Sequence, residues 1–331
     1  MSAPLTVSTG AEYSRLMSVA SFRGSRVVDN AEMCTHIDSS DEWIQQRTGI
    51  IERRWATEEE TPAYMCVQAA SKAIERAGLE PEDIDAIMIS TVSNFRQYPS
   101  LACEVASILG IPSPAAYDIR AACAGFCYGL AQADGFIRTG SAKHVLIIGM
   151  EWLSRQLNMQ DRGTAFLFGD GAGAAVVGPS ETPAIGPVVW GSDPAQHDAI
   201  WTNDWFDALK TGEKPVVHMN GRAVYLWSTT FIPEKAVEAV AKAGITPDQL
   251  DVFIPHQANN RITDSILRRL HLPDNVVVSR DIKHMGNVSA ASIPLAMDAL
   301  LESGEAKSGD NALIIGFGAG LVFAGQVVVL P

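Results

Sequence analysis

Long hydrophobic runs are missing from this sequence, and their absence argues against membrane-spanning helices. Although 47% of the 331 residues are hydrophobic, no run reaches the roughly 20 apolar residues that a transmembrane helix needs. Residues 1–10 are polar and contain neither a basic segment nor an apolar core, so we expect no signal peptide. The apolar stretches at 145–149 and 311–316 have the length of strands instead. We therefore predict a protein without membrane contacts.

Basic residues are also scarce. The chain has 25 Lys and Arg against 38 Asp and Glu, which gives a net charge of −13. General nucleic-acid binding requires a basic face that neutralises phosphates. We therefore expect no nucleic-acid partner, and any local basic cluster becomes notable.

Cysteine is too rare, and too irregularly spaced, for a disulfide framework or a zinc site. The five cysteines are an odd number, and none of them forms a CxxC pair. Free thiols in a chain without an export signal indicate a reducing compartment. These features predict a cytoplasmic protein with no metal site.

What the sequence does contain is a repeated unit of helix, glycine and strand. The predicted units are 62–77 with 86–90, 124–138 with 144–149, 233–243 with 252–255, and 290–302 with 312–316. The later two follow the earlier two at an offset near 166 residues, the separation of Gly78 and Gly244. Such units are common in α/β proteins, but two matched pairs favour duplication over chance. We predict two similar α/β halves, 12–182 and 183–331, with the functional site at their seam.

Cys123 is the first candidate for chemistry. It follows a predicted strand and begins a helix of small residues in the segment DIRAACAGF at 118–126. Backbone N–H groups at a helix N-terminus stabilise a thiolate and lower its pKa, as a nucleophile requires. A buried structural thiol is an equally favoured interpretation of Cys123, and it is our interpretation of Cys127.

Two polar residues lie where the repeat places the seam. His256 directly follows the strand at 252–255, so its side chain should point into a cleft at the strand ends. Asn287 lies two residues before the position that the repeat pairs with Cys123, so their loops should face each other. An amide donates an N–H without changing charge. A packed core histidine and a helix N-cap asparagine are the alternatives.

Two more features have less specific signals. The glycine run GFGAG at 316–320 can expose backbone N–H groups for an oxyanion hole. Arg261, Arg268 and Arg269 share one face of the helix after His256. Three such arginines usually just form a solvent-exposed helix face. On this acidic chain, however, they could attract an anionic partner.

Several motifs together resemble the β-ketoacyl-acyl-carrier-protein synthase III family. They are DSSDEWI at 38–44, RTGI at 47–50, ACAGF at 122–126, DRG at 161–163, PHQAN at 255–259 and GNVSAASIP at 286–294. The order and spacing match that family from Arg15 onward. The resemblance implies a thiolase-like α/β fold, with duplicated βαβαβ halves in a five-layer αβαβα arrangement.

The resemblance also implies a mechanism. Cys123 would take an acyl group from acyl-CoA, and His256 and Asn287 would stabilise the enolate formed as malonyl-acyl-carrier protein loses CO₂. The backbone N–H groups of Cys123 and Ala319 would hold the oxyanion. The product would be a 3-oxoacyl-carrier protein that starts fatty-acid synthesis, with no cofactor besides these substrates.

Binding roles follow from the same resemblance. The CoA-binding positions of the family correspond to Trp43, Arg47, Arg162, Gly221 and Asn259. The primer pocket corresponds to Tyr98 and Phe317, with Tyr98 supplied by the partner subunit of a homodimer, and the Tyr98 ring indicates a short acyl primer. The basic docking helix for the acidic acyl carrier protein corresponds to Arg261, Arg268 and Arg269.

Related proteins differ at identifiable positions. Elongating synthases carry a second histidine at the position of Asn287, and degradative thiolases carry a second cysteine in the C-terminal glycine run. A priming ketosynthase of a polyketide or other secondary-metabolite pathway shares the whole set and stays open as an alternative. A thioesterase-like hydrolase and a silent CoA-binding scaffold are disfavoured, the hydrolase because no carboxylate base is evident beside the motifs. Arg120, three residues before the nucleophile, is larger than the family pattern predicts and has no explanation from the sequence.

Overall fold

The computed structural model describes residues 5–331, and strands and helices alternate along its first half. The elements of this half are β1 (Tyr13–Arg23), β2 (Arg26–Asp29), α1 (Asn30–Met33), α2 (Asp41–Thr48), β3 (Glu52–Trp55), α3 (Pro62–Arg76), η1 (Pro81–Asp83), β4 (Ala86–Ser90), α4 (Leu101–Leu109), β5 (Ala115–Ile119), η2 (Ala122–Ala124), α5 (Gly125–Thr139), β6 (Val145–Trp152), η3 (Leu153–Gln156) and β7 (Asp170–Ser180). Five of these strands form one sheet in the order β1-β7-β6-β4-β5, and β2 pairs with β3.

The second half repeats this pattern, including a separate two-stranded pair after its first strand. Its elements are β8 (Val189–Ser192), η4 (Pro194–Gln196), β9 (Ile200–Thr202), α6 (Trp205–Thr211), β10 (Val217–Met219), α7 (Gly221–Thr230), α8 (Ile232–Lys242), η5 (Pro247–Gln249), β11 (Val252–Pro255), α9 (Asn260–Leu270), β12 (Val277–Val278), α10 (Ile282–Met285), η6 (Ser289–Ala291), α11 (Ser292–Ser303), β13 (Asn311–Gly318), η7 (Ala319–Leu321) and β14 (Val322–Val329). The second five-stranded sheet has the order β12-β11-β13-β14-β8, and β9 pairs with β10.

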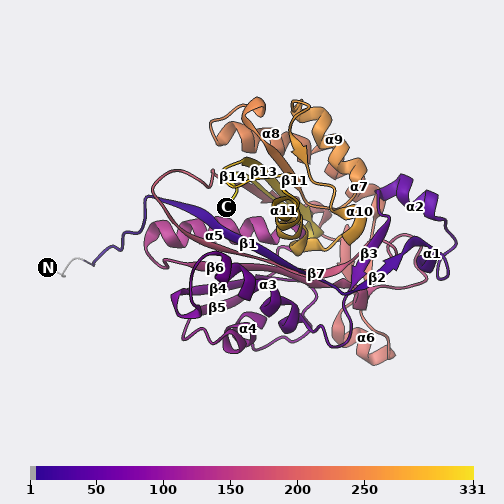
Figure 1. Cartoon of the computed structure of the whole chain (residues 1–331). Coiled ribbons are helices and arrows are strands. Elements are labelled where there is room, and N and C mark those ends of the chain that lie inside the picture. Colours follow the sequence, from indigo (N-terminus) through magenta and orange to yellow (C-terminus); the bar gives the residue numbers. More distant parts are fainter. Residues whose placement is uncertain (1–4) are drawn as a thin grey trace.

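The two sheets and their helices form five layers. Figure 1 shows α5 and α11 between the sheets, α3 and α4 on the outer face of the first sheet, and α8 and α9 on the outer face of the second. Both faces of each sheet are therefore covered, which is why the parallel strands β4 and β11 are buried along their whole length. Successive side chains of β4 alternate between layers: Met88 packs against the central helices, and Ile87 and Ile89 pack against the outer ones.

The predicted α/β fold with two similar halves is confirmed. Strands β4 and β11 begin and end at the predicted residues, and α3 and α8 lie within one residue of the predicted helices. In both halves a left-handed glycine follows the helix, Gly78 in the first and Gly244 in the second. Within residues 5–331, no helix is both long and apolar enough to cross a membrane.

The turns before the two central helices correct one detail of the repeat. The helices predicted to begin at 124 and 290 begin at Gly125 and Ser292, each after a short 3-10 turn. Ala122 and Ser289 open these turns, both with φ near 43°, a left-handed conformation that interrupts a helix. Ser289 therefore corresponds to Ala122, 167 residues earlier, and not to Cys123.

Candidate active site

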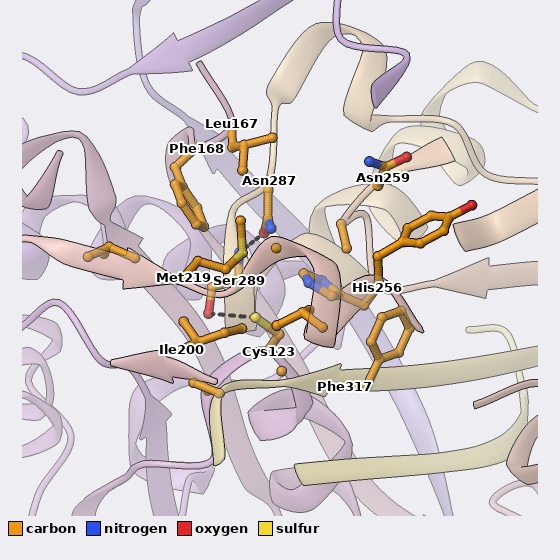
Figure 2. A pocket seen from close by; sticks show the side chains of 18 of the residues that line it. Cys123, Leu167, Phe168, Ile200, Met219, His256, Asn259, Asn287, Ser289 and Phe317 are labelled. Atoms are coloured by element: carbon orange, nitrogen blue, oxygen red, sulfur yellow. Dashed lines mark hydrogen bonds between the residues drawn. The ribbon is translucent and has the colours of Figure 1, made fainter. Parts of the chain in front are cut away.

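A cavity of about 670 Å³ lies at the seam, and residues of both halves line it. Cys123, His256 and Asn287 are all among the lining residues, so the fold brings together the three residues singled out from the sequence. Figure 2 shows their side chains converging on one region of the cavity from three different segments. Their roles in a reaction stay predictions, but their common location is a property of the structure.

Cys123 lies in the turn η2, directly before α5, where the predicted helix start places it. Its thiol donates a hydrogen bond to the Ser289 hydroxyl, with 3.3 Å between Sγ and Oγ (Figure 2). Gly318 of β13 packs closely on this residue: a Cβ on Gly318 would lie 2.7 Å from the Cys123 sulfur. The glycine run of the second half is therefore needed for close approach to the nucleophile loop of the first half.

The charge state of Cys123 differs from the sequence prediction. A helix N-terminus was expected to lower the pKa of its thiol, but burial raises that pKa to about 12. The hydrogen bond to Ser289 acts in the opposite direction and is the smaller effect. Cys123 is therefore a neutral thiol at pH 7 in this state, and a proton must leave it as it attacks.

His256 is buried and neutral. Burial lowers the pKa of its imidazole to about 3, so the ring carries no charge at neutral pH. Its Nδ1 lies 2.7 Å from the Ser292 hydroxyl oxygen, and that oxygen accepts a hydrogen bond from the Gln257 N–H at 3.4 Å. The Ser292 hydroxyl can thus donate to Nδ1, which leaves the ring hydrogen on Nε2. In this tautomer His256 is a neutral hydrogen-bond donor.

Asn287 is fixed on both sides. Its backbone N–H donates to the Leu167 carbonyl at 2.8 Å, and its carbonyl accepts from the Gly169 N–H at 3.0 Å. Its side-chain oxygen accepts the Ser289 N–H at 2.9 Å. Asn287 is not the N-cap of η6, which is Val288, but its contact with the Ser289 N–H directs its amide NH₂ away from that turn. The NH₂ group is therefore the part of the side chain that can bind an oxygen in the cavity.

The predicted oxyanion site is compatible with the turns on either side of the cavity. Cys123 and Ala319 both line the cavity, and each lies within a 3-10 turn, η2 or η7. The first N–H groups of such a turn have no acceptor within it. Both backbone N–H groups can therefore donate to a ligand, and their assignment stays a prediction.

Four of the five residues predicted to bind CoA line the cavity. Trp43, Arg47, Gly221 and Asn259 line it. Arg162 does not, but its guanidinium lies 4.9 Å from the centre of the Trp43 ring, and that of Arg47 lies 5.5 Å from it. Arg162 thus occupies the ring face on which a base would stack.

The two residues of the predicted primer pocket are in different places. Phe317 lines the cavity and packs edge-on against the His256 ring, with centroids 5.3 Å apart. Tyr98 is 85% exposed and is not among the lining residues of its own chain. Its predicted role requires a partner subunit and stays a prediction.

The three arginines predicted to dock a carrier protein are exposed on α9. Arg261 lines the cavity, and its guanidinium lies 4.7 Å from the centre of the Tyr225 ring. Arg268 and Arg269 lie in the last turn of the same helix and form no ion pair with the other described residues. Arg120 also lines the cavity, yet no contact with it explains why an arginine occupies this position.

Several lining and supporting residues were not predicted. Ile200 and Met219 come from β9 and β10, which lie between β8 and α8 as β2 and β3 lie between β1 and α3, and which fall outside the units predicted from the sequence (Figure 2). Ser289 and Ser292 lie within the motif at 286–294, so their presence was visible but their hydrogen bonds to Cys123 and His256 were not. Among the described residues, no cluster of three or more metal-ligating side chains is present.

The fold and these three side chains define a condensing enzyme of the thiolase fold. Models of one family match two segments of the chain: 3-oxoacyl-[acyl-carrier-protein] synthase III at 117–194 and its C-terminal region at 240–330. The chain is 51% identical to β-ketoacyl-[acyl-carrier-protein] synthase III 1 of Streptomyces coelicolor, over 98% of each chain. The chain therefore belongs to the 3-oxoacyl-[acyl-carrier-protein] synthase III family, and it is an acyltransferase.

Solved structures agree with this assignment. The priming β-ketosynthase of a polyketide biosynthetic pathway is 43% identical, with a TM-score of 0.97 over 99% of each chain. The 3-oxoacyl-[acyl-carrier-protein] synthase III of Aquifex aeolicus is 36% identical, with a TM-score of 0.89 over 96% of this chain and 99% of that one. The predicted family and its duplicated fold are thereby confirmed.

Proposed function

We propose that this enzyme joins a short acyl primer from acyl-CoA to the two-carbon unit of malonyl-acyl-carrier protein. The product is a 3-oxoacyl-carrier protein, which initiates fatty-acid synthesis. The observation that carries this proposal is the convergence of a thiol and two neutral hydrogen-bond donors, Cys123, His256 and Asn287, on one cavity.

The first half-reaction is transfer of the acyl group. The Cys123 sulfur attacks the thioester carbonyl, the bond from that carbon to the CoA sulfur breaks, and CoA leaves. Donation from the N–H groups of Cys123 and Ala319 stabilises the tetrahedral oxyanion. The close contact with Gly318 leaves no room there for a side chain beside the sulfur.

The second half-reaction is decarboxylation and condensation. Loss of CO₂ from the malonyl group leaves an enolate, whose oxygen receives hydrogen bonds from His256 Nε2 and the Asn287 amide. The enolate carbon then attacks the acyl-Cys123 thioester and displaces the thiolate. Because burial keeps the pKa of His256 at about 3, this residue remains a neutral donor throughout the physiological pH range.

The remaining assignments extend this proposal to the partners. Trp43 and Arg47 bind the nucleotide end of CoA, and the exposed arginines of α9 bind an acidic carrier protein. The enzyme acts in the cytoplasm as a homodimer, in which Tyr98 of one subunit closes the primer pocket of the other. No cofactor takes part.

Acylation of Cys123 is the direct test. The protein is incubated with acetyl-CoA, isobutyryl-CoA or a long-chain acyl-CoA, and its intact mass is measured. We expect one acyl adduct per chain with the short primers, and no adduct on the Cys123→Ala variant. Absence of any adduct on the wild type, or an adduct that survives in Cys123→Ala, would overturn the proposal.

A priming step in polyketide synthesis is a second candidate, favoured by the TM-score of 0.97 to such a ketosynthase. Both functions use the same half-reactions, so adduct formation does not separate them. Condensation rates with a fatty-acid carrier protein and with a polyketide carrier protein do. A preference for the fatty-acid carrier supports the first function, and the reverse preference supports the second.

A further inference from the structure

Glu151 is a fully buried carboxyl at the end of β6, and no step described so far uses it. Its Oε2 accepts hydrogen bonds from the Ser93 hydroxyl at 2.5 Å and from the Val92 N–H at 3.2 Å. Its Oε1 has no partner within hydrogen-bond distance among residues 5–331. A buried carboxyl oxygen without a partner is rare and calls for a functional explanation.

Ser289 lies between this carboxyl and the nucleophile. The turn η6 packs directly on the end of β6, where a Cβ on Gly149 would lie 2.2 Å from the Ala290 carbonyl oxygen. The Ser289 hydroxyl accepts the hydrogen bond of the Cys123 thiol, and it is close enough to Glu151 to lower the pKa of that carboxyl. The Ser289 hydroxyl is thus within reach of both the thiol and the carboxyl.

We propose that Glu151 stores the proton of Cys123 between the two half-reactions, with the Ser289 hydroxyl carrying it in both directions. This inference rests on the proposed function, because it needs an acyl-cysteine intermediate. As the sulfur–carbon bond forms, the thiol proton passes to Ser289 while the Ser289 proton passes to Glu151. The CoA thiolate leaves and takes a proton from water.

The stored proton returns in the second half-reaction. When the enolate displaces Cys123, the leaving thiolate takes a proton from Ser289, and Ser289 takes one from Glu151. The thiol and the carboxylate are then both restored. Over the whole cycle one proton enters from solvent and appears on CoA, which balances the loss of CO₂ from a malonyl carboxylate.

The ionisation behaviour of the neighbouring groups agrees with this role. Burial raises the pKa of Glu151 to about 7. The Ser93 hydroxyl and the Val92 N–H act in the opposite direction, and the Ser289 hydroxyl and the Ala290 N–H do so to a smaller extent. Its charge in turn raises the pKa of two titratable groups on packed elements, Cys123 on η2 and Cys66 on α3. Near neutral pH the carboxyl can therefore both accept and release a proton.

Other routes for the thiol proton are less suitable. Burial keeps the pKa of His256 at about 3, and Nδ1 of this ring is already bonded to Ser292. No carboxylate is evident beside the motifs in the sequence, and Glu151 is one that only the fold brings there. It does not line the cavity, so it has no direct access to a substrate or to a hydrolytic water there.

The test is the rate of Cys123 acylation in a rapid-quench experiment, followed by intact mass from pH 5.5 to 8.5. In the wild type we expect the rate to rise with pH through an apparent pKa near 7. In Glu151→Gln we expect a rate about 10²-fold lower, without that rise. Ser289→Ala should be slow as well, and the double variant no slower than the slower single variant, because both residues act in one path.

The Ser93→Ala variant tests whether Glu151 exchanges a proton, because a purely structural role of Glu151 would leave the pH profile of acylation unchanged. It keeps the carboxyl but removes a donor that lowers the Glu151 pKa, so the pH profile of acylation should shift to higher pH. This variant also keeps the proposal testable if Glu151→Gln fails to fold. Wild-type acylation rates and profile in Glu151→Gln, or an unshifted profile in Ser93→Ala, would overturn the proton store. An absent adduct on the wild type would instead overturn the proposed function.

Discussion

Ser90 and Glu151 lie at the ends of β4 and β6, and the repeat pairs them with His256 and Phe317 in the second half. The second-half residues both line the cavity, whereas neither first-half residue does. The turns before the central helices show the reverse: Cys123 lines the cavity, and Ala290, which the turn geometry pairs with it, does not. The two halves therefore share one backbone arrangement, but different positions of that arrangement line the cavity in each half.

This division predicts that the two halves can be disabled separately. The first half supplies the nucleophile from its turn, and the second supplies hydrogen-bond donors from a strand end and a loop. Variants of donor residues should then spare acylation. A substitution in one half at a residue that contacts the other half should affect the reaction step that the other half carries out.

The largest effect is expected for His256→Ala. Removing one donor to a developing oxyanion costs roughly 10²- to 10³-fold in rate, so condensation should fall by about this factor while Cys123 is still acylated. Product formation and the mass of the acyl adduct measure the two steps. His144→Ala, which removes another buried histidine, directly before β6, is the matched control. Loss of acylation in His256→Ala would contradict the division of roles.

The sequence predicted this division only in part. The strands β4 and β11 were found because a strand buried on both faces is a continuous apolar run. Cys123, His256 and Asn287 were found because each lies at the boundary of a predicted element, in a motif of a known family. Such local signals identify the residue, but they contain no information about its hydrogen-bond partners.

The parts that were missed depend on contacts between distant segments. Glu151 lies 28 residues after Cys123, at the end of an apolar strand, and only the packing of η6 on β6 brings it close to Ser289. The thiol pKa was predicted in the wrong direction because the helix start was visible in the sequence and the burial was not. The offset of 167 residues at the turns likewise follows from backbone angles that no residue type there demands.

Glu151 should also make the stability of the protein depend on pH, whereas Phe317, at the corresponding position of the second half, cannot ionise. The pKa of Glu151 is raised in the folded state to about 7 from the ordinary 4.5, so protonation of Glu151 favours folding. That contribution, about 3 kcal/mol, is full below pH 4.5 and is lost as the pH rises through 7. Urea unfolding at pH 5 and pH 8 should therefore show Glu151→Gln gaining on the wild type at the higher pH. His256 is present in both the wild type and Glu151→Gln, so its own titration cancels from the difference in their free energies of unfolding. A difference that does not change with pH would contradict the raised pKa of Glu151.

Gly318→Ala tests the contact between the halves, because it changes a residue of the second half and its effect is measured on the acylation of Cys123 in the first half. The added Cβ would lie 2.7 Å from the Cys123 sulfur, and overpacking of this kind costs about 1–3 kcal/mol. We expect acylation to slow by roughly tenfold. Gly135→Ala is the control, since a Cβ there meets open space on α5 and should leave acylation as it is. Equal acylation rates in both variants would show that the close contact is unimportant.

The smallest effect is expected where the second half meets a carrier protein. Reversing both Arg268 and Arg269 to Glu should raise the KM for malonyl-acyl-carrier protein by roughly fivefold, since exposed charges contribute only about 1 kcal/mol. High salt should reduce the difference because it screens these charges, and acylation by acyl-CoA should not change. Lys143→Glu with Lys307→Glu makes the same change in net charge in the loops that precede β6 and β13, at the opposite end of the strands from the cavity. A KM that rises equally in both double variants would mean that net charge, and not the face of α9, attracts the carrier.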